Sequence, residues 1–275
     1  MVIDSHQHFW KYDPIRDAWI NDEMPQLKKD FLPIDLQPLL TKNKIDGCVA
    51  IQADQSENET EFLLELAVKN SSIEGVVGWI NLSAPNVEEK LNYFSKFKKL
   101  KGFRHIVQAE PDDRFMLRPD FMNGIRLLKK FNFTYDVLIY PKQFPAAIEL
   151  VNLFPDHKFV IDHLAKPNIK NKEINSWKQY MNNMAQNKNV YCKISGMTTE
   201  ANWKNWKASE FTPYLDVVFE SFGVDRIMYG SDWPVCLLAA TYEQQLKIIQ
   251  DYIQSLTNEN QFKVMGKNAK DFYNL

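Results

Sequence analysis

Short apolar runs rich in β-branched residues recur along the chain at regular intervals. There are eight of them, at residues 2–9, 47–53, 75–81, 102–107, 134–140, 158–164, 190–196 and 226–233. Most are nearly continuously apolar and do not alternate with polar residues. This pattern is typical of parallel strands that are covered on both faces.

The segments between these runs have helical spacing. In residues 59–70, for example, Phe62, Leu63, Leu66 and Ala67 fall on one face of a helix. The other clear cases are residues 86–100, 120–130, 146–154 and 242–256. Alternating strands and helices without a linker-like break predict one domain over residues 1–275, an α/β protein with a closed (β/α)8 (TIM) barrel. An open doubly wound sheet is the alternative, weakened by the absence of a Gly-rich phosphate loop after the first strand.

Two connections are longer than the usual loop. Residues 11–33 follow the first predicted strand and residues 197–210 follow the seventh, and both contain tryptophan. Long loops in compact domains are usually functional or disordered, and the tryptophans argue against disorder. In a barrel both loops emerge at the C-terminal ends of the strands, where active sites lie. We therefore expect them to form walls over a pocket.

The length and charge of the chain indicate what kind of molecule the protein binds. The 275 residues are close to the size of about 250 that a (β/α)8 barrel needs. The 33 Lys and Arg residues nearly balance 35 Asp and Glu residues, for a net charge of −2. Acidic and basic residues alternate, so neither nucleic acid nor an anionic membrane surface is an expected partner. A small-molecule ligand fits better.

The cysteines indicate a reducing compartment. Cys48, Cys192 and Cys236 are odd in number, far apart and set in apolar segments, which predicts buried, reduced thiols. Neither a signal peptide nor a membrane span is predicted. We therefore expect a cytoplasmic protein, and a homo-oligomer is left open because the sequence does not specify the oligomeric state.

The first and last strands carry the most informative polar residues. His6 and His8 lie two positions apart, so on a strand they share one face. Burying two imidazoles without partners is costly, which favours a functional role. Asp232 ends the apolar run of the eighth strand and is a candidate base or metal ligand, with a helix N-cap as the alternative.

Strands four and six each offer two adjacent polar residues. These are Arg104 with His105 and Asp162 with His163. Neighbouring side chains on a regular strand point to opposite faces, so only one member of each pair is expected to face the barrel interior. The spacing alone does not decide which one.

Further candidates have a structural as well as a functional interpretation. Lys193 on strand seven is an edge feature or a phosphate contact, and no other phosphate signal supports the second reading. The tryptophans Trp10, Trp19, Trp203, Trp206 and Trp233 are either loop anchors or aromatic walls of a sugar-sized site.

Several of these segments together resemble a known family. "DSHQHFW" on the first strand, "DHLAKP" on the sixth and "YGSDWP" on the eighth resemble the amidohydrolase superfamily, in particular its amidohydrolase-2 branch. Within that branch, "NVYCKISGMTTEANW" and "YGSDWPVCLLAATYEQ" are similar to the sugar lactonases that act on L-fuconolactone and L-rhamnonolactone. The likeness extends over the whole barrel.

The resemblance implies roles for the candidate residues. His6, His8, His163 and Asp232 would form the inner site, Arg104 and not His105 would face the substrate, and Asp232 would be the general base. The strand-five histidine of two-metal members is missing, so a binuclear centre is not expected. The resemblance is compatible with a single divalent cation, such as zinc, on His6, His8 and Asp232, and also with metal-free catalysis that uses Arg104.

The expected activity is hydrolysis of a sugar (aldono) lactone to the sugar acid. Residues expected to contact the substrate are Trp10, Gln52, Tyr140, Lys193, Trp203 and Trp233. A zinc-dependent decarboxylase of an aromatic or related carboxylic acid is the main alternative. An amide or phosphoester hydrolase and a non-catalytic binding barrel are less favoured.

Overall fold

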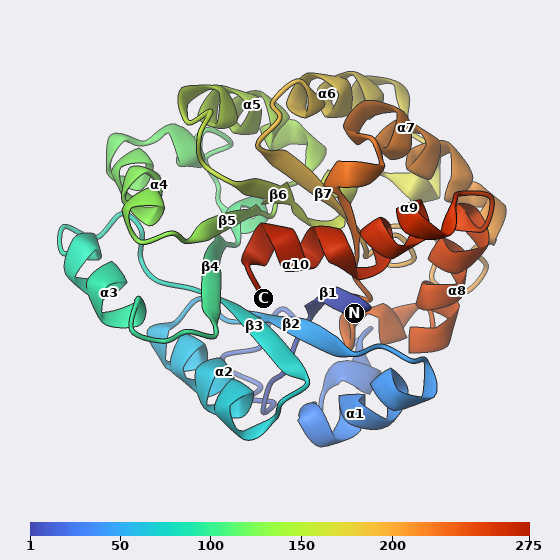
Figure 1. Cartoon of the computed structure of the whole chain (residues 1–275), viewed down its shortest axis with the longest axis horizontal. Coiled ribbons are helices and arrows are strands. Elements are labelled where there is room, and N and C mark those ends of the chain that lie inside the picture. The colour runs from blue at the N-terminus through green and yellow to red at the C-terminus, as the bar shows by residue number, and fades with distance from the viewer.

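Eight parallel strands lie side by side in chain order in the computed structural model, which describes residues 1–275 (Figure 1). They are β1 (Ile3–Gln7), β2 (Gly47–Ile51), β3 (Ile73–Gly78), β4 (Leu100–His105), β5 (Thr134–Val137), β6 (Phe159–Ile161), β7 (Val190–Ile194) and β8 (Ile227–Tyr229). The ring closes between the end of β1 and the segment after β8, where the His8 N–H donates to the Trp233 carbonyl at 2.7 Å. The predicted barrel is confirmed, and the open doubly wound sheet is wrong.

Helices follow the strands and surround the barrel (Figure 1). They are α1 (Pro33–Lys42), α2 (Glu57–Lys69), α3 (Val87–Phe94), α4 (Pro119–Lys130), α5 (Phe144–Leu153), α6 (Asn175–Ala185), α7 (Thr212–Phe222), α8 (Tyr242–Ile253), α9 (Asn258–Phe262) and α10 (Asn268–Tyr273). The side chains of Ser56 and Thr241 cap α2 and α8 by accepting backbone N–H groups. None of the helices combines the length and apolar composition that crossing a membrane requires.

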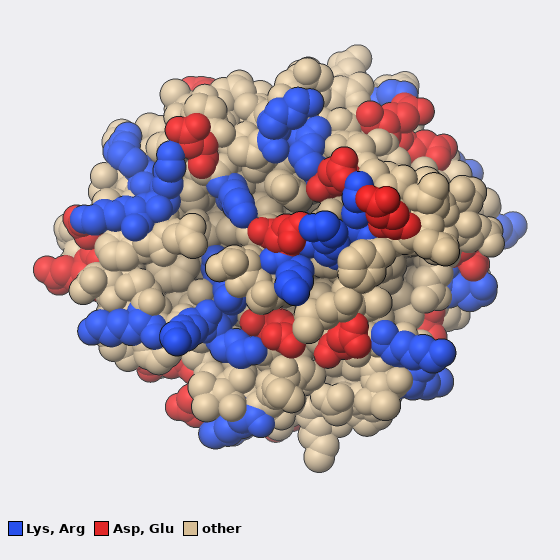
Figure 2. Space-filling view, in the orientation of Figure 1, with Lys and Arg blue, Asp and Glu red and all other residues tan.

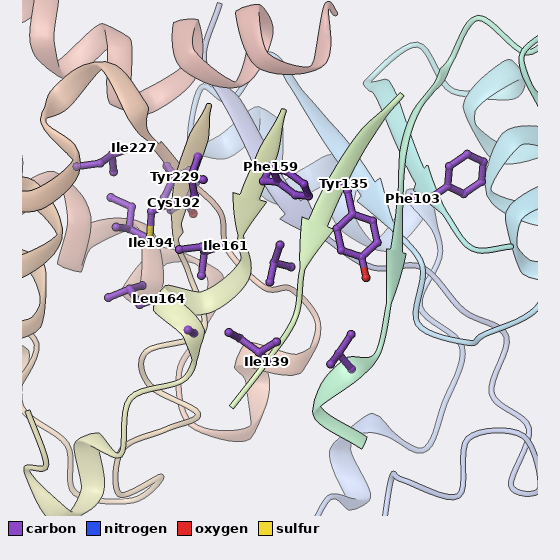
Figure 3. Packing of buried hydrophobic residues seen from close by; sticks show 14 of the residues in the cluster. Phe103, Tyr135, Ile139, Phe159, Ile161, Leu164, Cys192, Ile194, Ile227 and Tyr229 are labelled. Carbon is purple, nitrogen blue, oxygen red and sulfur yellow. The ribbon is translucent and has the colours of Figure 1, made fainter. Parts of the chain in front are cut away.

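Strand alternation separates the core from the barrel interior. Phe103, Tyr135 and Phe159 on neighbouring strands belong to the large cluster between the strands and the helices (Figure 3). Arg104 and Asp136, one position further along, face the interior and pair with charged groups there. The three cysteines also lie buried as free thiols, as predicted.

The last helix closes the N-terminal end of the barrel. In Figure 1, α10 crosses the middle of the ring, and both chain ends lie beside it. A second, smaller apolar cluster joins α10 to the half of the barrel interior nearest the N-terminal ends of the strands, called the lower half below. Its members are Ile3, Val49, Ile51, Val77, Val160, Met228, Ala269, Phe272 and Tyr273. The apolar floor therefore lies at the end opposite the expected active site.

Lysines hold α10 in place from outside the barrel. Lys101 donates to the Asn274 carbonyl at 2.7 Å, and Lys158 donates to the carbonyls of Asp271 and Phe272, both at 3.2 Å. Positive charge near the carbonyl end of a helix also matches the helix dipole. Figure 2 shows acidic side chains interleaved with the basic ones around the C-terminus.

All eight strands end two to four residues before the predicted apolar runs do, and two of these early ends matter for the site. β6 stops at Ile161 and β8 at Tyr229, although the runs continue to residues 164 and 233. The chain then enters left-handed conformations, with φ of 51° at His163 and 58° at Asp232. Few non-glycine residues adopt such values, which often mark functional sites. These turns change the direction in which the polar side chains point.

Candidate active site

His6 on β1 and His8, the residue directly after that strand, both point into the barrel interior. A register irregularity between Asp4 and Gln7 lets Ile3 and His6 face inward together. Asp4 instead lies on the outer side, where it accepts hydrogen bonds from the Ser231 N–H at 2.8 Å and from Tyr242 of α8 at 3.1 Å. Asp4 thereby ties β1 to the loop that carries Asp232, a role that the sequence did not reveal.

The imidazoles of His6 and His8 meet as predicted. Their Nε2 atoms are 3.2 Å apart, and Nδ1 of His8 lies 2.8 Å from the Ile51 carbonyl oxygen. Because a carbonyl only accepts, Nδ1 of His8 carries the proton and its Nε2 presents a lone pair toward His6. Asp232 Oδ1 lies 3.4 Å from His8 Nε2 and 3.9 Å from His6 Nε2.

Arg104, and not His105, faces the interior. Its Nη1 donates to Asp162 Oδ2 at 3.0 Å and lies 3.2 Å from His6 Nε2, while Nη2 contacts the carbonyl and side-chain oxygens of Gln52. His105 points away, stacks on Phe115 and contacts Glu110 at 2.7 Å. Gln52 is fully buried, so it holds the guanidinium in place at the base of the site.

Asp162 and His163 both face the interior, so the expectation that only one of them would is wrong. Asp162 Oδ1 lies 3.2 Å from His6 Nδ1, and His163 Nε2 lies 3.8 Å from Asp232 Oδ1. The strict alternation of a strand ends at Ile161, and the left-handed turn that follows carries His163 over the same site. Ser195 at the end of β7 holds the other ring nitrogen of His163 at 2.9 Å.

Burial and neighbouring charges set the protonation states. Burial lowers the pKa of His6 and His163 well below 6.5, so both imidazoles are neutral at pH 7. Burial opposes ionisation of Asp232, but the adjacent His163 and His8 outweigh it and hold the pKa of this carboxyl below 3.8. Asp232 is therefore a carboxylate at pH 7, the protonation state that accepting a proton requires.

Lys193 lies beneath the histidines and has no exposed surface. Its ammonium contacts Asp136 at 2.5 Å, Asp162 at 3.0 Å and His6 Nδ1 at 3.3 Å. Enclosed in this way it has no room to touch a substrate, which corrects that expectation and also excludes an edge position. Asp136 was missed, although a lone carboxylate at an inward position of an apolar strand is a recognisable signal.

The predicted aromatic contacts lie at different depths. Trp10 and Trp233 are 1% and 2% exposed and pack edge-on against Phe31, so they anchor the loop after β1. Tyr140 is 39% exposed, and the Lys166 ammonium lies 5.5 Å from its ring centre.

Trp203 lines a cavity of about 440 Å³ that Glu23 and residues 199–204 also line. Both long loops, after β1 and after β7, therefore contribute to one cavity. None of His6, His8, Arg104, His163 and Asp232 lines it, so the place of the loops as walls over the active site stays a prediction.

The donor set suits a divalent cation. Ligand atoms of His6, His8 and Asp232 lie within 4.8 Å of one another, and all three residues are buried. Two imidazole nitrogens and one carboxylate are typical zinc ligands, and three protein ligands leave a position free for water or substrate. The His8 Nε2 lone pair points toward the other ligand atoms, which fits this use.

Comparisons with known proteins show the family of the chain. The chain is 37% identical to the L-fucono-1,5-lactonase of Burkholderia multivorans over 263 residues, which covers 92% of this chain and 88% of that protein. It is 30% identical to the L-fucono-1,5-lactonase of Burkholderia ambifaria, covering 99% and 95%. A crystal structure of a Burkholderia multivorans amidohydrolase with bound zinc superimposes with a TM-score of 0.96 at 36% identity, covering 100% and 99%. The amidohydrolase family model matches residues 3–275, and the chain belongs to that family.

Proposed function

We propose that this protein is a lactonase that hydrolyses a sugar lactone of the L-fucono-1,5-lactone type to the sugar acid. The observation that carries the proposal is the convergence of a buried carboxylate, Asp232, with His6, His8 and the Arg104 guanidinium at the C-terminal end of the barrel. Similarity to two L-fucono-1,5-lactonases supports the choice of substrate class.

Asp232 acts as the base in this scheme. Its carboxylate takes a proton from a water molecule, and the water oxygen forms a bond to the lactone carbonyl carbon. When the tetrahedral intermediate collapses, the bond between the acyl carbon and the ring oxygen breaks, and Asp232 returns the proton to that oxygen. The product hydroxy acid then ionises and releases one proton to solvent.

The negative charge that develops on the carbonyl oxygen needs a preorganised positive neighbour. The Arg104 guanidinium is fixed next to His6 by Asp162 and Gln52, so its charge is in place before the substrate arrives. A divalent cation held by His6, His8 and Asp232 would polarise the same carbonyl and lower the pKa of its bound water toward 7. We include this single cation, with zinc as the first candidate, in the proposal.

A pH-indicator assay across aldonolactones tests the proposed function. The expected result is acid release from the 1,5-lactone of L-fucose, faster than from lactones that lack the sugar hydroxyls. Release of carbon dioxide from an aromatic acid without lactone turnover would instead favour the decarboxylase. Activity after exhaustive chelation, together with elemental analysis of the protein, decides whether the cation is needed.

A further inference from the structure

Two buried groups of opposite charge compete for the same nitrogen of His6. Asp162 Oδ1 lies 3.2 Å from Nδ1, and the Lys193 ammonium lies 3.3 Å from it. A carboxylate only accepts and an ammonium only donates, so the two neighbours favour opposite tautomers of the ring. With the proton on Nδ1, the lone pair of Nε2 faces the site. With the proton on Nε2, that nitrogen cannot bind a cation.

A third group favours the proton on Nδ1. Arg104 Nη1 lies 3.2 Å from His6 Nε2, and a guanidinium only donates. A proton on Nε2 would therefore face a second donor across this contact. Asp162 and Arg104 therefore favour the proton on Nδ1. Lys193 opposes them, and so does the His8 Nε2 lone pair, which lies 3.2 Å from His6 Nε2.

Lys193 is restrained by a chain of contacts that begins at the opposite end of the barrel. Its shortest contact, 2.5 Å, is to Asp136 Oδ2, and the Tyr273 hydroxyl donates to the same oxygen at 2.7 Å. The ammonium also lies 5.4 Å from the centre of the Tyr273 ring. Tyr273 is the last residue of α10, so the helix that closes the barrel floor reaches the group that faces His6.

We infer that Asp136 and Tyr273 are positioning residues that direct the Lys193 ammonium toward carboxylates and not toward the His6 lone pair, which keeps the proton of His6 on Nδ1 and leaves on Nε2 a lone pair able to bind a cation. The inference deepens the proposed function, on whose cation site it rests. It also explains why a lysine, an arginine and two aspartates are buried here. A well-packed apolar core would be as stable or more stable, so stability does not account for these charges.

The experiment compares Tyr273→Phe and Asp136→Asn with the matched control Tyr135→Phe. Tyr135, on β5, is buried like Tyr273. Its hydroxyl has no hydrogen-bond partner, however, and its ring packs outward against Phe121. Each protein is labelled with ¹⁵N-histidine and freed of metal. The ring nitrogen signals of His6 are assigned by their loss in His6→Asn, and zinc affinity is measured by calorimetry.

In the wild type and in Tyr135→Phe we expect His6 to carry its proton on Nδ1. In Asp136→Asn the signals should shift toward the Nε2–H form and zinc affinity should fall by about 10- to 100-fold, the usual effect of losing an outer-shell partner of a metal ligand. Tyr273→Phe should change the His6 signals and the zinc affinity in the same direction as Asp136→Asn, but by a smaller amount. Because this variant removes only a hydroxyl, it keeps the test valid if Asp136→Asn folds poorly.

The inference would be overturned if Asp136→Asn and Tyr273→Phe both kept the His6 tautomer and the zinc affinity of the wild type. An Nε2–H signal of His6 in the wild type would also overturn it. A wild type that binds no zinc would contradict the proposed cation site. In that case the His6 signals of the metal-free proteins still decide whether Asp136 and Tyr273 set the tautomer. Neither the tautomer measurement nor the zinc titration uses lactone turnover. The inference can therefore be tested even if the proposed lactonase activity is not found.

Discussion

The two halves of the barrel interior are built from the same strands but from opposite kinds of residue. The lower half is apolar, with Ile3, Val77 and Val160 packed against α10. The upper half holds charged groups that include Arg104 and Lys193, both almost without exposed surface. Burial of apolar groups stabilises the fold, whereas burial of charges costs free energy unless each is paired.

Along the barrel axis, the residues that stabilise the fold are therefore separate from the residues proposed to carry the chemistry. Substitutions in the lower half should reduce stability and leave turnover unchanged. Substitutions in the upper half should affect turnover, and those that leave a charge unpaired should affect stability as well. Three of the four predictions below test this separation and the remaining one, on Glu59, tests a buried carboxyl outside the barrel interior; they begin with the largest expected effect.

Asp232→Asn should lower kcat by about 10²- to 10⁴-fold, the usual contribution of a general base. Asparagine has nearly the same shape but cannot take a proton, so the thermal midpoint should stay close to that of the wild type. Steady-state lactone hydrolysis and circular dichroism melting measure the two effects. A variant that retains wild-type kcat removes Asp232 from the role of base.

Lys193→Met should destabilise the protein by about 3–5 kcal/mol, because it leaves buried carboxylates without their cation. Asp136→Asn in the same chain removes one of those charges, so the double variant should recover part of the loss. Urea unfolding of the wild type, both single variants and the double variant gives the coupling. A double variant no more stable than Lys193→Met would contradict the pairing seen in the structure.

Glu59 provides a pH test at the C-terminal edge of the barrel. It accepts the N–H groups of Ala53 and Asp54, and burial raises its pKa from 4.5 to about 7. Between these values the unfolded chain loses a proton that the folded protein keeps, so this group lowers stability as pH rises from 4.5 to 7. Glu59→Gln should remove that part of the slope. The unfolding free energy of the wild type and of Glu59→Gln is measured in urea from pH 4.5 to 8. If it changes with pH by the same amount in both proteins, Glu59 does not titrate in this way.

Ile3→Val should have the smallest effect, a loss of about 0.5–1.5 kcal/mol in unfolding free energy. Ile3 is fully buried in the lower half and contributes no polar group to the site. The kcat for lactone hydrolysis should not change. A large loss of kcat without a loss of stability would mean that the two halves are not separable.

Much of the fold follows from the sequence because it depends on pattern. Continuous apolar runs separated by helical segments specify a parallel barrel, and the spacing of His6 and His8 puts them on one face. That Asp162 and His163 both face the interior does not follow, because it depends on left-handed backbone after Ile161 that no residue type in "DHLAKP" predicts. The link from Tyr273 to Asp136 joins residues 137 positions apart, and only the folded chain shows it.

The central claim is that the charged upper half is a site for lactone hydrolysis with Asp232 as its base. Its most direct test is the initial rate of acid release from L-fucono-1,5-lactone by the wild type and by Asp232→Asn, measured side by side in weakly buffered indicator. We expect rapid acid release by the wild type and a rate near that of spontaneous hydrolysis with the variant. Equal rates for the two proteins, or no release above the spontaneous rate by the wild type, would contradict the claim.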